Sequence, residues 1–302
     1  MTAEIVLRDV TLRDGLQDED PISTATKVAL YEALVAAGIR DLELTSFVHP
    51  RRVPAMADAE ELCASTASSA ETGGVVRWGL ALNVRGAQRA LSADLRHLQY
   101  VVSVSDTHSR HNAGASTDDA VAGLREVVAL AAPAGAAVEV TLATAFGCPY
   151  EHRIDPARVV DVAERCVEAG VTSVGLADTI GVAIPKEVTA LIAAVEGAVD
   201  VPLGVHLHDT RGLGVANALA AIDAGVRRID GSVGALGGCP FAPGASGNLA
   251  LEDLAHVLEE SGIATGVSVD GLVAAAQLAT GAVGRAVSSH VGLAGPRFRS
   301  RP

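Results

Sequence analysis

The sequence predicts an α/β fold, a (β/α)8 TIM barrel with an additional C-terminal helix and a basic tail. Short apolar runs alternate with longer amphipathic segments, and this alternation implies a parallel sheet. A length of 302 residues is typical of one such barrel. Aromatic residues make up only 3% of the chain, so small and branched aliphatic side chains must fill the core. We expect a single domain over residues 1–302, with the barrel at about 4–262 and the extra helix and tail at about 263–302.

Eight strands are expected where short apolar runs lie between turn signals. In chain order they are Glu4–Leu12, Arg40–Thr45, Val75–Leu82, His97–Val104, Ala137–Phe146, Val171–Asp178, Val201–His208 and Arg227–Val233. Because a helical pattern follows each run, eight strand–helix units favour a closed barrel over an open sheet.

The amphipathic segments carry the start and stop signals of helices. The first is capped near Ser23 or Thr24 and stops at Gly38, and another starts at Thr117 with acidic residues that suit its N-terminus. The other expected helices are Pro54–Ala64, Ala87–Leu91, Asp155–Ala169, Pro185–Val199, Leu213–Ala224, Asn248–Ser261 and the additional Val269–Val283.

Composition excludes several classes of function. A formal net charge of -13 argues against general binding to nucleic acid or to anionic membranes. No apolar run approaches the roughly 20 residues that span a bilayer. The cysteines at 63, 148, 166 and 239 show no CxxC spacing, and no secretory signal follows Met1, so we expect a reduced, cytoplasmic protein.

Polar side chains occur at the end of every predicted strand, where a barrel of this kind places its active site. They include Arg13, Asp14, Glu43, Asn83, Ser105, Asp106, Cys148, Asp178, Thr179, His206, His208, Cys239 and Asn248. Cys239 stands in LGGCPFAPGASGN, a stretch that can be neither helix nor strand, so it lies on a loop. Cys239 is then either a functional thiol or a small loop residue, whereas Cys148 is expected to be structural and Cys63 and Cys166 to lie in the core.

The motif HLHD indicates a metal site. Alternate residues of a strand point the same way, so His206 and His208 face one side. Asp14 neighbours them across the barrel closure, and Asn248 can reach in from the last loop. Two nitrogen and two oxygen ligands suit Mg²⁺ or Mn²⁺ and match a closed structural zinc site poorly.

Each of these residues also has a structural interpretation. The two histidines can be hydrogen-bonded barrel residues, and Asp14 can be a turn residue. Asn248 can serve as the N-cap of the last barrel helix, alone or while also binding the metal. Arg13 can merely pair with Asp14 or Glu43.

The chain resembles the 3-hydroxy-3-methylglutaryl-CoA lyase family of metal-dependent lyase and condensing-enzyme barrels. The matching segments are TLRDGLQDE (Thr11–Glu19), ELTSFVHPRRVPAM (Glu43–Met56), FGCPYE (Phe146–Glu151), ADTIGV (Ala177–Val182), HLHDTRGLGVAN (His206–Asn217) and GALGGCPFAPGASGNLALEDL (Gly234–Leu254). The Gly-Gly-Cys-Pro loop is specific to the lyases within that group, and the matches spread over most of the chain.

The resemblance implies a divalent cation, most simply Mg²⁺ or Mn²⁺, held by Asp14, His206, His208 and Asn248. It implies retro-Claisen cleavage of 3-hydroxy-3-methylglutaryl-CoA, or a close analogue, to acetyl-CoA and acetoacetate, as in leucine degradation. Arg13 then faces the thioester oxygen, Cys239 arrives with a closing loop as proton donor or relay, and the base is His206 or Asp178. The other implied site residues are Glu43 as a catalytic acidic residue and Gln17, Asn83, Ser105 and Thr179 as substrate contacts. A homodimer is expected.

Several positions depart from the family pattern. Asp20 stands where relatives carry a basic residue, Asp106 stands for the usual Glu, and Glu139-Val140-Thr141 replaces Arg-Gly-Tyr. We expect these changes near the acyl pocket and the CoA approach. Basic residues that can replace the lost charge toward the CoA phosphates are Arg51, Arg52, Arg297, Arg299 and Arg301. After Asp106, His108 and His111 are expected in an exposed loop.

The departures leave two alternatives open. One is a related lyase or condensing enzyme that acts on a different hydroxy acid or acyl-CoA. The other is a non-catalytic metal-binding barrel, which the joint presence of Arg13, Asp178 and Cys239 disfavours.

Overall fold

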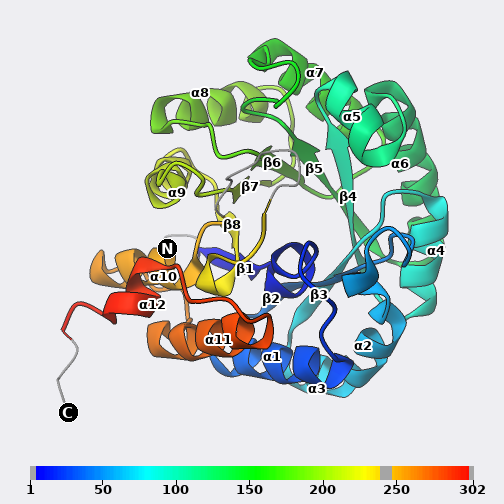
Figure 1. Ribbon diagram of the computed structural model, residues 1–302. Coiled ribbons are helices and arrows are strands. Elements are labelled where there is room, and N and C mark those ends of the chain that lie inside the picture. The colour runs from blue at the N-terminus through cyan, green and yellow to red at the C-terminus, as the bar shows by residue number, and fades with distance from the viewer. Residues whose placement is uncertain (1–4, 239–246, 299–302) are drawn as a thin grey trace.

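The computed structural model describes residues 5–238 and 247–298 and confirms the predicted TIM barrel (Figure 1). Eight parallel strands pair in sequence order and close into a barrel, which helices surround. The strands are β1 (Val6–Asp9), β2 (Asp41–Ser46), β3 (Val76–Leu80), β4 (His97–Ser103), β5 (Ala137–Ala143), β6 (Val174–Asp178), β7 (Leu203–Leu207) and β8 (Arg228–Gly231).

The outer ring follows the predicted helix order with three additions. The helices are α1 (Thr24–Ala36), α2 (Ala59–Ser65), α3 (Ala67–Gly73), α4 (Val84–Ser92), α5 (Asp106–Ala113), α6 (Thr117–Ala131), α7 (Pro156–Glu168), α8 (Pro185–Glu196), α9 (Gly214–Asp223), α10 (Leu251–Glu260), α11 (Val269–Ala282) and α12 (His290–Ala294). The predicted cap of α1 is confirmed, since the Ser23 side chain accepts a hydrogen bond from the Thr26 amide at 3.1 Å. In the described part of the chain, no helix is long and apolar enough to span a bilayer.

The first predicted strand was too long. β1 ends at Asp9, and Thr11–Gly15 form a π-helical turn in which the Gly15 amide donates to the Val10 carbonyl at 3.0 Å. The turn is fixed by Asp9, whose carboxylate accepts from the Thr11 amide and hydroxyl at 2.9 and 2.7 Å. It places Arg13 and Asp14 above the end of the strand.

The prediction for the segment after β4 was also wrong. We expected an exposed loop there, and the segment forms the helix α5. Ser105 caps α5 by accepting from the His108 amide at 3.1 Å, and Gly114 ends it in the left-handed conformation at φ +74°. His108 is buried, not exposed. Its polar neighbours in sequence hid the helix, since only His108 and Ser109 are buried on it.

Glu139 does not lie in the acyl pocket, as we expected from the departure on β5. It sits inside the barrel, where it bridges two arginines: the Arg228 guanidinium donates to it at 2.6 Å and Arg8 forms a second ion pair. Arg8 also stacks on the Trp78 ring at 4.2 Å. A buried carboxylate between two guanidiniums is a compensated charge, so the change at 139 belongs to the barrel core.

The C-terminal helices pack on the outside of the barrel. α11, which confirms the predicted extra helix, packs on α1 and α10 (Figure 1). At the start of α10, Glu252 accepts hydrogen bonds from the Gly234 amide and the Ser289 hydroxyl at 2.8 and 2.5 Å. This carboxyl group thus joins the end of β8 to the C-terminal segment, and its burial raises its pKa to about 7.

Glu252→Gln should make stability less dependent on pH. Between pH 4.5 and about 7 the folded chain holds the Glu252 proton that the unfolded chain has lost, so wild-type stability falls as pH rises through this window. This pH-dependent loss in the free energy of unfolding amounts to about 3 kcal/mol by linkage, and the variant does not undergo it. The Tm difference, variant minus wild type, should therefore increase between about pH 5 and about pH 8. Glu259→Gln, on the exposed face of α10, is the matched control, and a Glu252→Gln difference that stays constant contradicts the assignment.

Candidate active site

A cavity of about 660 Å³ opens at the C-terminal ends of the strands. Seven residues predicted for the site line it, namely Arg13, Asp14, Gln17, Asn83, Thr179, His206 and His208. Cys239 lies outside the described residues, although its neighbour Gly238 is on the cavity wall. The cavity wall therefore draws residues from the ends of all eight strands.

Three predicted metal ligands converge on one wall. The Nε2 atoms of His206 and His208 lie 3.2 Å apart. The Asp14 Oδ2 atom lies 3.9 Å from the first and 3.8 Å from the second. All three ligand atoms are within 4.8 Å of one another, as a shared cation requires.

Asn248 supplies the fourth group. Its Nδ2 atom donates to Asp14 Oδ2 at 2.8 Å and to the Leu236 carbonyl at 2.9 Å, while its buried Oδ1 has no partner among the described residues. An unpaired buried oxygen beside a carboxylate and two imidazoles fits a bound cation. The interpretation of Asn248 as a helix cap was wrong, because α10 starts only after Ala250.

The protonation states suit metal binding. Burial and the charge of His206 lower the pKa of His208 to about 4, so its imidazole is neutral at neutral pH. Burial raises the pKa of Asp14, but Arg13 and the two histidines outweigh burial and hold that pKa well below its usual value. For His206, burial lowers the pKa, yet the neighbouring carboxylates of Asp230 and Asp14 raise it overall. Asp14 is thus a carboxylate and His208 a free base.

Arg13 is held in place from below. Its Nε and Nη2 atoms bind Glu43 Oε2 at 2.8 and 2.7 Å, and its Nη1 atom pairs with Asp14. Arg13 therefore forms both of the ion pairs that the sequence suggested for it, with Asp14 and with Glu43. Glu43 is fully buried and lies off the cavity wall, whereas Arg13 is on it. Glu43 consequently orients the arginine, and Arg13 remains available to a ligand in the cavity.

Asp178 and Ser105 lie behind the cavity wall. The Asp178 carboxylate accepts from the amides of Val182 and Ala183, both at 2.9 Å, and so fixes the loop after β6. Ser105 caps α5 and accepts from the Cys148 thiol at 3.0 Å. The structure gives both residues supporting positions, and the roles predicted for them in catalysis and substrate contact stay predictions.

The other cysteines match their structural interpretation. Cys63 and Cys166 are buried in the core. Cys148 Sγ accepts from the amides of Tyr150 and Glu151 at 3.3 and 3.4 Å, as a turn-forming sulfur does.

A polar wall lies on the far side of the cavity, lined by Gln99, His108, Asn112 and Thr141 from β4, α5 and β5. Thr141 was expected near the acyl pocket, whereas sequence reasoning missed the site positions of the other three. The available signal was the period of two on β4, which puts Gln99 and Val101 on one face. Asp230, whose Oδ2 lies 3.7 Å from His206 Nδ1, was missed as well.

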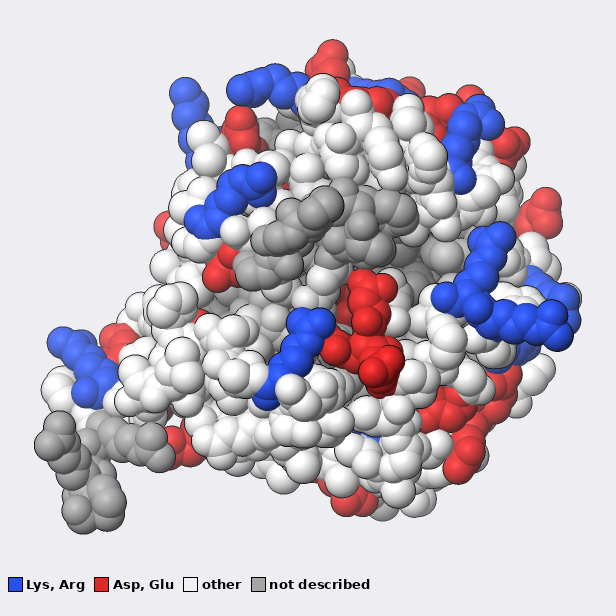
Figure 2. Space-filling view, in the orientation of Figure 1, with Lys and Arg blue, Asp and Glu red and all other residues white. Residues whose placement is uncertain are grey.

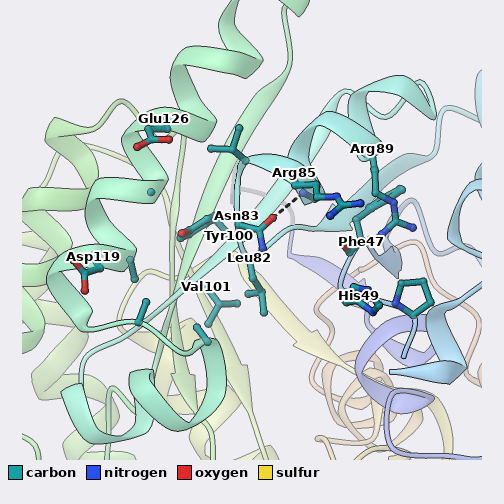
Figure 3. A pocket seen from close by; sticks show the side chains of 17 residues that line it. Phe47, His49, Leu82, Asn83, Arg85, Arg89, Tyr100, Val101, Asp119 and Glu126 are labelled. Atoms are coloured by element: carbon teal, nitrogen blue, oxygen red, sulfur yellow. Dashed lines mark hydrogen bonds between the residues drawn. The ribbon is translucent and has the colours of Figure 1, made fainter. Parts of the chain in front are cut away.

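A second cavity of about 770 Å³ adjoins the first and shares five lining residues with it, namely His49, Leu82, Asn83, Val101 and Ala113. Figure 3 shows Arg85 and Arg89 along one side and acidic residues of α6 on the other. Basic side chains also gather at the α4 side of the barrel mouth in Figure 2, whereas acidic ones gather beside the turn after β1. Glu19, four residues after that turn, pairs with Arg285 at 2.8 Å.

Comparisons with known proteins agree with this geometry. The family model described as HMGL-like matches residues 4–279. An (R)-citramalyl-CoA lyase of Chloroflexus aurantiacus is 38% identical over 97% of this chain and 96% of its own length. A hydroxymethylglutaryl-CoA lyase of Bacillus subtilis is 35% identical over 95% and 96%. The solved structure of an HMG-CoA lyase from Acinetobacter baumannii, in complex with coenzyme A and 3-methylmalate, superimposes with a TM-score of 0.92 at 36% identity and covers 100% of this chain and 99% of that one. The chain therefore belongs to the HMGL-like family.

Proposed function

We propose that the protein is a divalent-metal-dependent carbon–carbon lyase that cleaves 3-hydroxy-3-methylglutaryl-CoA, or a close 3-hydroxyacyl-CoA analogue, by retro-Claisen chemistry. The observation that carries the proposal is the convergence of Asp14, His206 and His208 beside Arg13 in one cavity. The names of the relatives at 35–38% identity support an acyl-CoA substrate.

The cation would be held by Asp14, His206, His208 and Asn248. When bound, it lowers the pKa of the substrate hydroxyl group and so eases the loss of its proton. Mg²⁺ and Mn²⁺ suit two imidazoles and two oxygens with positions left for substrate.

The remaining chemistry belongs to side chains of this chain. Arg13 presents a planar cation to the thioester oxygen and stabilises the charge of the leaving enolate, and Glu43 keeps that cation oriented. The enolate carbon takes a proton to become the methyl group of acetyl-CoA. The donor role of Cys239 and the choice between His206 and Asp178 as base stay predictions.

For the CoA phosphates we propose the α4 side of the mouth. Arg52 lines the first cavity and Arg85, on α4, lines the second, and both are exposed. Arg51, next to Arg52 in sequence, is exposed as well. Arg297, also considered for this role, instead pairs with Glu260 at 3.0 Å; Arg299 and Arg301 lie outside the described residues. The homodimer and the cytoplasmic location stay predictions.

A second substrate has an observation in its favour. The Chloroflexus relative is a citramalyl-CoA lyase at 38% identity, and the cavity wall carries Gln99 and Thr141. (R)-citramalyl-CoA is therefore the alternative substrate for the same reaction type.

Purified protein with Mn²⁺ or Mg²⁺ should release acetyl-CoA from 3-hydroxy-3-methylglutaryl-CoA, because the hydroxyl group needs the cation to lose its proton. Acetoacetate and acetyl-CoA are followed with metal and with chelator, and (R)-citramalyl-CoA is assayed in parallel. Release that persists after complete chelation contradicts the metal-dependent mechanism. Release from (R)-citramalyl-CoA alone selects the alternative substrate.

His208→Ala should lower kcat/KM on the order of 10³-fold or more, since it removes a ligand from the cation. Titration calorimetry should show that Mn²⁺ affinity falls in parallel. His256→Ala, on α10 and away from both cavities, is the matched control and should keep activity and affinity. Wild-type Mn²⁺ affinity in the folded His208→Ala protein would rule out the proposed ligand set.

A further inference from the structure

Two polar side chains from adjacent strands lie on the cavity wall that faces the metal ligands. Gln99 on β4 is 1% exposed and Thr141 on β5 is 6% exposed, and both line the cavity. The Gln99 Nε2 atom donates to Thr141 Oγ1 at 2.7 Å. This bond fixes the direction of the glutamine amide.

The other end of the amide is unsatisfied. Gln99 Oε1 is buried and has no hydrogen-bond partner within residues 5–238 and 247–298. A buried polar atom without a partner destabilises the site. A ligand that supplies the missing hydrogen-bond donor therefore gains affinity. The unpaired atom is a carbonyl oxygen, so its partner in a ligand must be a hydrogen-bond donor.

The residues around Gln99 Oε1 indicate which kind of ligand group can donate to it. His108, on the same wall, binds the Ser103 hydroxyl through Nδ1 at 2.6 Å. Burial lowers the pKa of His108 to about 4, so the imidazole is neutral at neutral pH. Asn112 and Thr141 are neutral as well. The wall is polar but carries no charge, which suits a hydroxyl group better than an ammonium group or a carboxylate.

We propose that Gln99 determines substrate specificity by accepting a hydrogen bond from a hydroxyl group on the acyl part of the substrate, with Thr141 as its positioning residue. The inference rests on the proposed function and refines its substrate class to 3-hydroxyacyl-CoA esters with a second hydroxyl group, such as a hydroxymethyl group at C3 instead of a methyl group. Cleavage of such an ester breaks the C2–C3 bond. The C3 hydroxyl group loses its proton and becomes a ketone, and C2 gains a proton, giving acetyl-CoA and 4-hydroxyacetoacetate.

The test compares two glutaryl-CoA esters that differ only in a methyl or a hydroxymethyl group at C3 beside the 3-hydroxyl. Wild type should favour the hydroxymethyl ester by about 10-fold or more in kcat/KM, because a methyl group leaves Gln99 Oε1 unpaired. Gln99→Leu should bring this ratio close to one. Thr141→Val should reduce the ratio, and Thr141→Ser, which keeps the hydroxyl group, should restore it. Gln277→Leu, on the exposed face of α11, is the matched control and should leave the ratio unchanged.

An unchanged ratio in folded Gln99→Leu, with thermal unfolding as the check of folding, overturns the inference. A wild-type ratio of one or less does the same. If neither ester is cleaved, the proposed function fails, and calorimetric titration of both esters into Mg²⁺-loaded wild type and Gln99→Leu then decides the inference by itself. Tighter binding of the hydroxymethyl ester that is lost in the variant supports it, and equal binding refutes it.

Discussion

The closure of the barrel between β1 and β8 is the constraint on which the site depends. β1 pairs with β8 from Val6↔Arg228 to Asp9↔Gly231, so the turn after β1 lies beside the loops after β7 and β8. The Thr11 hydroxyl group strengthens this junction by donating to Asp9 and accepting from the Val233 amide at 2.9 Å. Without closure, Asp14 and Asn248, 234 positions apart in sequence, would not share a hydrogen bond.

The junction also sets the charge balance of the site. Glu43 and Asp14 together bring two carboxylates against the single guanidinium of Arg13, whereas Asp230, behind His206, pairs with Arg228 at 3.3 Å. A divalent cation at the two imidazoles would compensate the extra carboxylate, because an uncompensated carboxylate in such an environment is costly. The same cation would bind the unpaired Asn248 Oδ1. Geometry and electrostatics therefore favour the same occupant.

Patterns of period two and 3.6 were sufficient to predict the barrel, its strand order along the chain and the facing pair His206 and His208. They were insufficient where tertiary bonds decide local structure. The π-helical turn after β1 exists because Asp9 and Thr11 lock it, and α5 forms although its sequence is almost entirely polar. Glu139 was misplaced because a strand pattern alone does not say how deep in the barrel a side chain lies. Gln99 was missed because its proposed role comes from an unpaired atom, which a sequence does not show.

The most direct test of the central claim is the crystal structure of the Mn²⁺-loaded protein, with anomalous scattering to locate the ion. The account predicts one Mn²⁺ bonded to the Nε2 atoms of His206 and His208, to a carboxylate oxygen of Asp14 and to Oδ1 of Asn248. A cavity without Mn²⁺ at saturating concentration, or an ion that bypasses the two imidazoles, would contradict it.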